Sequence, residues 1–226
     1  MHIEPGIVHG AKMVLAYGTA AGAAGYAAKL AWDDLKAHGA APLVVRSALA
    51  TVGTFLFFEV LPHFPVGVSE VHFILGTTLL LLLGVAPAAI GLAAGLAIQG
   101  MLFAPSDLPM YFVNVTTLLV PLFAIFALSK RIIAPDTAYV DLLYGQALRL
   151  SATYQGGVIA WVAFWALYGQ GFGAENLAAV FSFGAAYMLV IVIEPLADLA
   201  VLALAKTGRN LLQNPHLTHP RLHAAA

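Results

Sequence analysis

The chain contains no cysteine and little charge, and both absences narrow its class. Without cysteine it has no disulfide, no thiolate metal site and no thiol nucleophile. Only 9% of its 226 residues are charged, against about 25% in soluble domains, and 61% are hydrophobic. A surface that faces lipid needs no polar cover. We therefore expect an all-α integral membrane protein in contact with lipid, and the net charge of −1 indicates no nucleic-acid partner.

Motifs for enzymatic chemistry are also missing. The sequence has no Gly-x-x-x-x-Gly-Lys-Ser/Thr loop for ATP and no His-Glu-x-x-His zinc motif. Residues 1–6 include Glu4 and Pro5 and lack the basic stretch that opens a signal peptide. We therefore expect that the chain is not an enzyme and that Met1 is its mature N-terminus.

Long apolar stretches indicate the number of membrane spans. A spanning helix needs roughly 20 mostly apolar residues. Seven stretches come close to this length: 9–31, 43–62, 70–84, 86–103, 111–129, 145–168 and 177–205. The third and fourth meet at residues 85–87, so they form either a tight helical hairpin or one broken segment.

Basic residues decide between six and seven spans and orient the chain. Cytoplasmic connections carry an excess of Lys and Arg. The connections 63–69, 104–110 and 169–176 contain no Lys or Arg. Nine of the ten basic residues lie in or beside the other connections and the C-terminal tail, and Lys12 is the exception. This pattern predicts a seven-helix bundle with its N-terminus outside and its C-terminus in the cytoplasm.

The chain shows no linker or change in composition that would divide its apolar part. We therefore expect a single transmembrane domain over residues 1–206. The polar segment 207–226 contains two prolines and three histidines and is predicted to be a flexible cytoplasmic tail. Its histidines could give it a weak affinity for metal ions, but a plain flexible end is the simpler interpretation.

Three ionisable side chains lie inside apolar stretches: Glu59, Glu194 and Asp198. Charges within a membrane are costly, so such residues are usually functional or paired. Glu59 lies one helical turn before His63, and the two could share a proton. Pairing of the three acids with Arg46 or Arg149 is the structural alternative.

Histidines gather on the predicted outer side, where the topology places His2, His9, His63 and His72. Four imidazoles on one face favour a metal site. An N-terminal Met1-His2 pair offers three nitrogens in a row: the terminal amine, the deprotonated amide and the imidazole. One further nitrogen would complete a square-planar site, which suits Ni(II) or Cu(II).

Small residues recur every four positions in the first predicted span, at Ala20, Ala24 and Ala28. This spacing lets another helix approach closely. It serves either packing within the bundle or docking of a partner subunit.

Three stretches of the chain resemble motifs of one known family. The start Met-His-Ile-Glu-Pro-Gly is similar to a Met-His-Ile opening, and the stretch from Phe64 through His72 to Thr77 resembles a Phe-Pro-Val…Thr-Ser-Gly-His-Leu-Leu-Gly-Gly-Thr signature. Residues 98–104, Ile-Gln-Gly-Met-Leu-Phe-Ala, look like an Ile-Gln-Ala-Leu-Leu-Phe-Ala run. These motifs resemble those of the CbiM/NikM family, the substrate-binding (S) components of energy-coupling-factor (ECF) importers for cobalt and nickel.

The resemblance implies a seven-helix S component whose N-terminus enters the bundle from outside. It places Ni²⁺ or Co²⁺, as transported substrate, on Met1, His2 and His72. Glu70, His63, His9 and Asn114 would surround these ligands. Two departures concern the neighbours of the site: Glu4-Pro5-Gly6 replaces a variable residue followed by Glu-Gly, and Ser69-Glu70-Val71 stands where the family has Thr-Ser-Gly.

The function expected from the resemblance is uptake of nickel or cobalt across a prokaryotic cytoplasmic membrane. A transmembrane coupling (T) subunit and ATPase subunits would supply the energy, and Ala20, Ala24 and Ala28 would form a docking face. Two rivals remain: a membrane enzyme that uses outer histidines for a metal or haem, and an assembly subunit that binds no ion.

Overall fold

The computed structural model describes residues 3–224, without the side chains of residues 210 and 211. Its principal helices are α1 (Met13–His38), α2 (Ala40–Phe55), α3 (Gly76–Leu83), α4 (Val85–Leu102), α5 (Tyr111–Ile132), α6 (Tyr144–Gln170), α7 (Ala174–Thr207) and the short α8 (Arg209–Leu212). A π-helical turn (Leu56–Val60) continues α2, and 3-10 turns cover Gly10–Lys12, Pro105–Met110, Tyr139–Asp141 and Pro220–Leu222. One antiparallel hairpin joins β1 (Phe64–Val66) to β2 (Ser69–Val71).

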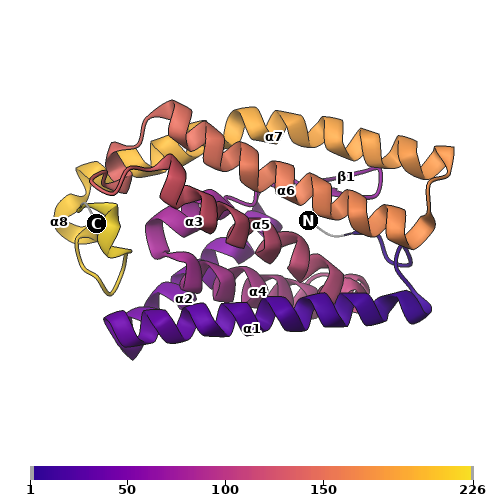
Figure 1. Ribbon diagram of the computed structural model, residues 1–226, viewed down its shortest axis with the longest axis horizontal. Coiled ribbons are helices and arrows are strands. Elements are labelled where there is room, and N and C mark those ends of the chain that lie inside the picture. Colours follow the sequence, from indigo (N-terminus) through magenta and orange to yellow (C-terminus); the bar gives the residue numbers. More distant parts are fainter. Residues whose placement is uncertain (1–2, 225–226) are drawn as a thin grey trace.

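The helices form an elongated bundle (Figure 1). Helix α1 runs along one long edge, α6 and α7 run along the opposite edge, and the remaining long helices lie between them. The hairpin lies in one half of the bundle, and the chain ends at the opposite end with α8 beside it.

Five helical segments of the described chain are long and apolar enough to cross a membrane: Ala40–Val60, Val85–Leu102, Pro105–Ile132, Tyr144–Gln170 and Ala174–Thr207. They confirm a multi-pass helical membrane protein and match five of the expected stretches. Helix α1 has 26 residues but is not among the five. The count of seven spans and the orientation of the termini stay predictions.

The expectation of one continuous helix over residues 70–84 is wrong. Residues 69–71 form β2, residues 72–75 form neither helix nor strand, and α3 has only eight residues. The hairpin forms because Gly67, at φ +62°, allows a tight turn between Val66 and Ser69. Hydropathy alone does not detect such a break, since the average over residues 70–84 is apolar despite Glu70 and His72.

Two glycines of α4 determine how closely it packs on α2. A Cβ at Gly91 would lie 2.3 Å from the Ala50 Cβ and 2.6 Å from the Ala50 carbonyl carbon. One turn later, a Cβ at Gly95 would lie 2.7 Å from Thr54. Small residues four positions apart therefore bring the two backbones together, as in other membrane helix pairs.

Arg46 does not pair with the intramembrane acids in the described structure. Its fully buried guanidinium binds Asp34 at 2.8 Å and the Leu83 carbonyl at 2.9 Å. Glu194 and Asp198 instead hydrogen-bond the neutral side chains of Gln155 and Thr78. Arg46 thus joins the end of α1 to the end of α3, a role that charge spacing did not predict.

The C-terminal tail contacts the bundle. Leu222 is fully buried, and the His219 backbone N–H donates to the Leu82 carbonyl at 2.7 Å. The His219 ring stacks on Tyr139 with 5.6 Å between centroids. Burial, followed by the nearby Arg46 charge, lowers the pKa of His219 to about 4. The domain boundary at residue 206 and the flexibility of the tail stay predictions.

Candidate metal site

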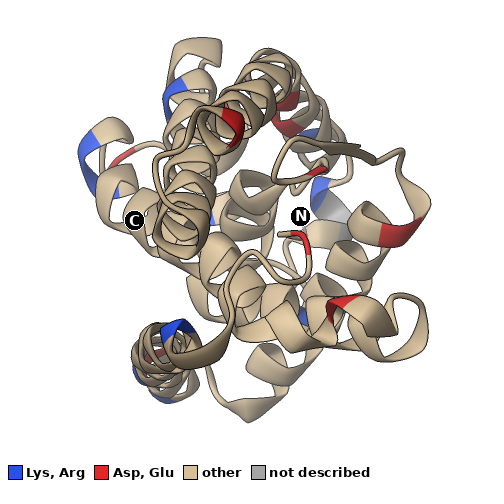
Figure 2. Ribbon diagram, turned by 90° about the vertical axis from the view of Figure 1, so that its right-hand side faces the viewer, with Lys and Arg blue, Asp and Glu red and all other residues tan. Residues whose placement is uncertain are grey.

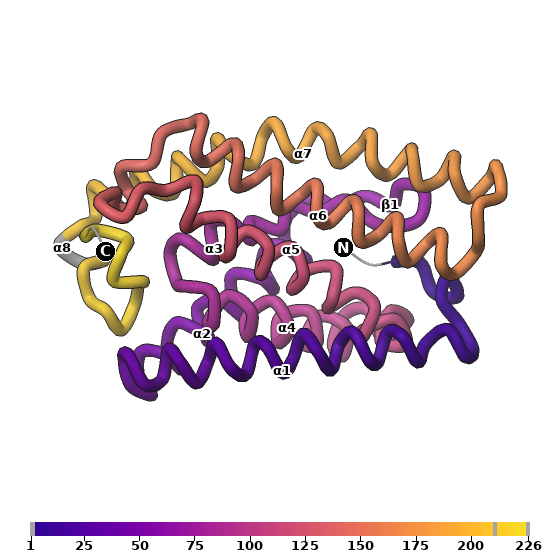
Figure 3. Tube along the Cα trace, in the orientation of Figure 1, coloured from indigo at the N-terminus to yellow at the C-terminus, as the bar shows by residue number. Residues whose placement is uncertain are grey.

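The N-terminal segment (residues 3–8) is anchored in the bundle by its buried residues, whereas residues 4–6 are exposed. Ile3 is fully buried, pairs with Ser69 of β2, and its backbone N–H donates to Asn114 Oδ1 at 2.9 Å. The Glu4 N–H donates to the Val68 carbonyl at 3.3 Å. Figure 3 follows this segment from α1 toward the middle of the bundle. The hairpin and α5 therefore fix where the chain enters.

His72 lies directly after β2, and 1% of it is exposed. Its Nε2 lies 2.9 Å from Glu70 Oε2. Alternate residues of an extended chain share a face, which explains why Glu70 reaches the imidazole. The His63 ring stacks on the His72 ring at 4.8 Å with 10° between planes, and Phe58 meets it edge-on at 5.3 Å. The imidazole is thus held on several sides.

Three of the predicted neighbours of the site lie beside His72 or the N-terminal segment. His63 and Glu70 contact His72, and Asn114 holds the backbone of Ile3. His9 is exposed, beside the 3-10 turn before α1. Met1 and His2 lie outside the described residues.

The expected link between Glu59 and His63 is not found among residues 3–224. The His63 Nδ1 lies 3.3 Å from the Leu61 carbonyl instead. Glu59 is half-buried on the π-helical turn. The turn ends at Val60 and Leu61 is extended, so His63 lies beyond the helix and the i to i+4 geometry on which the prediction relied is absent.

Tyr187 is the neighbour of His72 that sequence reasoning missed. Its hydroxyl lies 3.5 Å from the His72 backbone nitrogen and 3.3 Å from the His72 carbonyl oxygen. The residue is fully buried in α7. A buried tyrosine hydroxyl needs a polar partner, so a tyrosine in the middle of an apolar span was the available signal.

Carboxylates gather near the N-terminal segment. Partial burial raises the pKa of Glu4, and the charges of Glu70 and Asp107 raise it further. Figure 2, which looks along the bundle, shows acidic positions around this segment. A concentration of negative charge attracts cations.

Within residues 3–224, no three His, Asp or Glu side chains come close enough to hold a metal ion together. Beside the His72 imidazole lie the Glu70 carboxylate and a second imidazole, that of His63.

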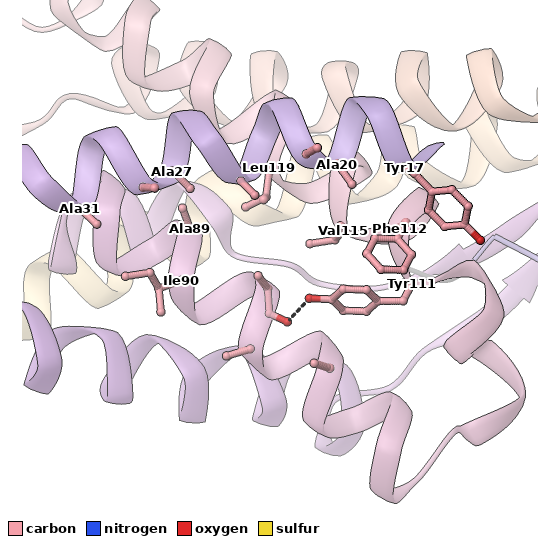
Figure 4. Close-up of a pocket in the computed structure, with 16 residues that line it drawn as sticks. Tyr17, Ala20, Ala27, Ala31, Ala89, Ile90, Tyr111, Phe112, Val115 and Leu119 are labelled. Atoms are coloured by element: carbon pink, nitrogen blue, oxygen red, sulfur yellow. Dashed lines mark hydrogen bonds between the residues drawn. The ribbon is translucent and has the colours of Figure 1, made fainter. Parts of the chain in front are cut away.

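The alanines of α1 border a groove of about 800 Å³ between α1, α4 and α5. Ala20 is buried there, whereas Ala24 and Ala28 are exposed. Figure 4 shows α1 above the groove, with Ala89 and Ile90 of α4 on its other wall. Part of the alanine row therefore packs within the bundle, and part of it is open.

Comparison with known proteins identifies the family of this chain. The family model for the cobalt uptake substrate-specific transmembrane region, CbiM, matches residues 2–211. The chain belongs to this family. It is therefore a multi-pass membrane component of metal uptake, as the sequence motifs indicated. No curated protein matches the chain.

One solved structure, described as the crystal structure of a truncated transition metal transporter, has the same fold. The alignment has a TM-score of 0.68 and 17% identity, and it covers 92% of this chain and 99% of the other. At this identity the likeness concerns the fold.

Proposed function

We propose that the chain is the substrate-binding subunit of an ATP-driven, ECF-type nickel or cobalt importer. It captures Ni²⁺ or Co²⁺ from the outside with four nitrogens: the Met1 amine, the His2 amide, the His2 imidazole and the His72 imidazole. One observation carries the proposal: the N-terminal segment is anchored beside a buried histidine. Ile3 pairs with Ser69, three residues before His72.

Chain length restricts where the remaining ligands can lie. Two residues span at most about 7 Å, so the groups of Met1 and His2 stay close to the buried Ile3 nitrogen. That nitrogen is itself held by Asn114 at 2.9 Å. Because the hairpin joins Ile3 to the strand that precedes His72, both halves of the proposed site share one support.

The chemistry of the ligands favours divalent transition-metal ions over hard ions. Imidazole suits nickel and related metals, whereas Mg²⁺ and Ca²⁺ prefer oxygen. Four nitrogens in one plane favour Ni²⁺. Glu70 orients the His72 ring through Nε2, and metal binding at that atom would displace this contact. Binding also releases protons, because the His2 amide and both imidazoles must be deprotonated.

The energy for transport would come from partners. A transmembrane coupling subunit would dock on the open side of α1, where Ala24 and Ala28 are exposed. ATPase subunits would drive the cycle, since this sequence has no phosphate-binding loop of its own.

The test is a Ni²⁺ titration of the purified full-length protein by calorimetry. His72→Ala and an added residue before Met1 should each abolish tight binding. His216→Ala removes an exposed tail histidine and is the matched control. Unchanged affinity in both site variants would refute the proposal and favour an assembly subunit. A visible haem band in the purified protein would favour the enzyme.

A further inference from the structure

One face of α7 carries three buried polar side chains: Tyr187, Glu194 and Asp198. At most 1% of each residue is exposed. Their spacing of seven and then four residues places them on the same side of a helix. All three point toward the segment that joins His72 to the first turn of α3.

Tyr187 holds the backbone of His72 at two points. Its hydroxyl accepts from the His72 N–H at 3.5 Å and donates to the His72 carbonyl at 3.3 Å. The two residues are 115 positions apart in sequence, so the contact joins separate parts of the fold.

Glu194 and Asp198 hold the residues that follow His72. The Leu75 backbone hydrogen-bonds Glu194, and the Thr78 backbone hydrogen-bonds Asp198. The Thr78 hydroxyl donates to Asp198 Oδ1 as well. The first N–H groups of a helix have no partner within it, and a membrane interior offers no water to bind them. The two acids therefore supply acceptors where α3 begins.

The segment is strained as well as held. Leu75 has φ +52° and ψ +34°, a left-handed conformation that costs free energy in a residue with a branched side chain. Such a conformation persists only where the surroundings impose it. Gln155 of α6 donates to Glu194 from the other side, so α7 is itself tied to the bundle at this point.

We propose that Tyr187, Glu194 and Asp198 are positioning residues that fix the His72 imidazole for metal binding. They touch no metal; they set the backbone from which His72 projects. The inference rests on the proposed function and adds that α7, far away in sequence, determines the affinity and geometry of the site.

The central variant is Tyr187→Phe, which removes one hydroxyl and keeps the ring. Tyr139→Phe is its matched control, because Tyr139 is also buried and its ring contacts His219 and Arg221 of the tail, outside the His72 segment. Loss of two hydrogen bonds that orient a ligand should weaken Ni²⁺ binding about tenfold. It should also shift the d–d absorption of the bound ion, which a loss of stability alone would not do. Tyr139→Phe should leave both readouts unchanged.

Asp198 gives a second test that does not depend on Tyr187. Asp198→Asn keeps an oxygen that can accept from Thr78, so it should retain near-normal affinity. Asp198→Leu removes the acceptor and should weaken binding and shift the spectrum in the same direction as Tyr187→Phe. This rescue by the conservative variant separates positioning from a need for negative charge.

The outcomes distinguish the inference from the proposed function. If His72→Ala abolishes binding while Tyr187→Phe and Asp198→Leu bind with normal affinity and spectrum, the role of α7 is refuted and the proposed site stands. Equal effects of Tyr187→Phe and Tyr139→Phe would refute it too. If His72→Ala binds like the wild type, both proposals fail.

Discussion

Gly169 of α6 tests how the N-terminal segment is seated. A Cβ at this position would lie 2.0 Å from the Ile7 carbonyl oxygen, whereas ordinary contacts begin at 3.4 Å. Gly169→Ala therefore requires the Ile7 carbonyl to move by about 1.4 Å. Ile7 also donates its N–H to the Glu4 carbonyl at 3.2 Å, so the displacement reaches the part of the segment that pairs with the hairpin.

The expected magnitude follows from the cost of overpacking. Inserting a methyl group into a filled space costs about 1–3 kcal/mol. If this cost falls on the seated N-terminal segment, Ni²⁺ affinity drops roughly 5- to 150-fold. Calorimetric titration measures the loss directly.

Gly156→Ala is the control for the change of residue type. Gly156 lies on the same helix, and a Cβ there would meet nothing within 4 Å. It should bind Ni²⁺ normally and gain about 0.5–1 kcal/mol of stability, because alanine is the better helix former. Wild-type affinity in Gly169→Ala would refute the seating of the N-terminal segment as a requirement for metal binding.

Three further predictions concern other parts of the chain. The pKa of His219 is about 4 in the docked tail, against 6.5 for a free histidine, so docking is favoured above pH 6.5 and weakens as the pH falls toward 4. The loss amounts to about 2 kcal/mol near pH 5 and should appear as faster proteolysis of the tail; an unchanged rate would contradict it. Gly91→Ala pushes against the Ala50 backbone and should lower the free energy of unfolding by about 1–3 kcal/mol, which a lower thermal unfolding midpoint in detergent would show. Glu4→Gln should slow Ni²⁺ association a few-fold at low salt and hardly at high salt, since it removes one charge near the site; a salt-independent change would argue against an electrostatic cause.

The helical membrane architecture could be predicted because lipid imposes long apolar helices on any spanning segment. The third expected span is not one continuous helix, for a physical reason: residues 70–84 are apolar enough to span, but β2, the strained Leu75 and a short α3 divide them. Tertiary contacts with α7 stabilise that break, and hydropathy carries no information about them.

The candidate site was only partly predictable. His72, His63 and Glu70 lie close together in sequence, so topology and motif similarity identified them. The contacts of Tyr187 with His72 and of Arg46 with Asp34 and Leu83 join residues that no local pattern connects. The ligand roles of Met1, His2 and His72 stay predictions.

An X-ray absorption spectrum of the Ni²⁺-loaded protein, recorded beside His72→Ala, tests the central claim most directly. The account predicts four nitrogen ligands in a square-planar arrangement, which includes one imidazole that disappears in the variant. A spectrum dominated by six oxygen ligands, or one that His72→Ala leaves unchanged, would contradict it.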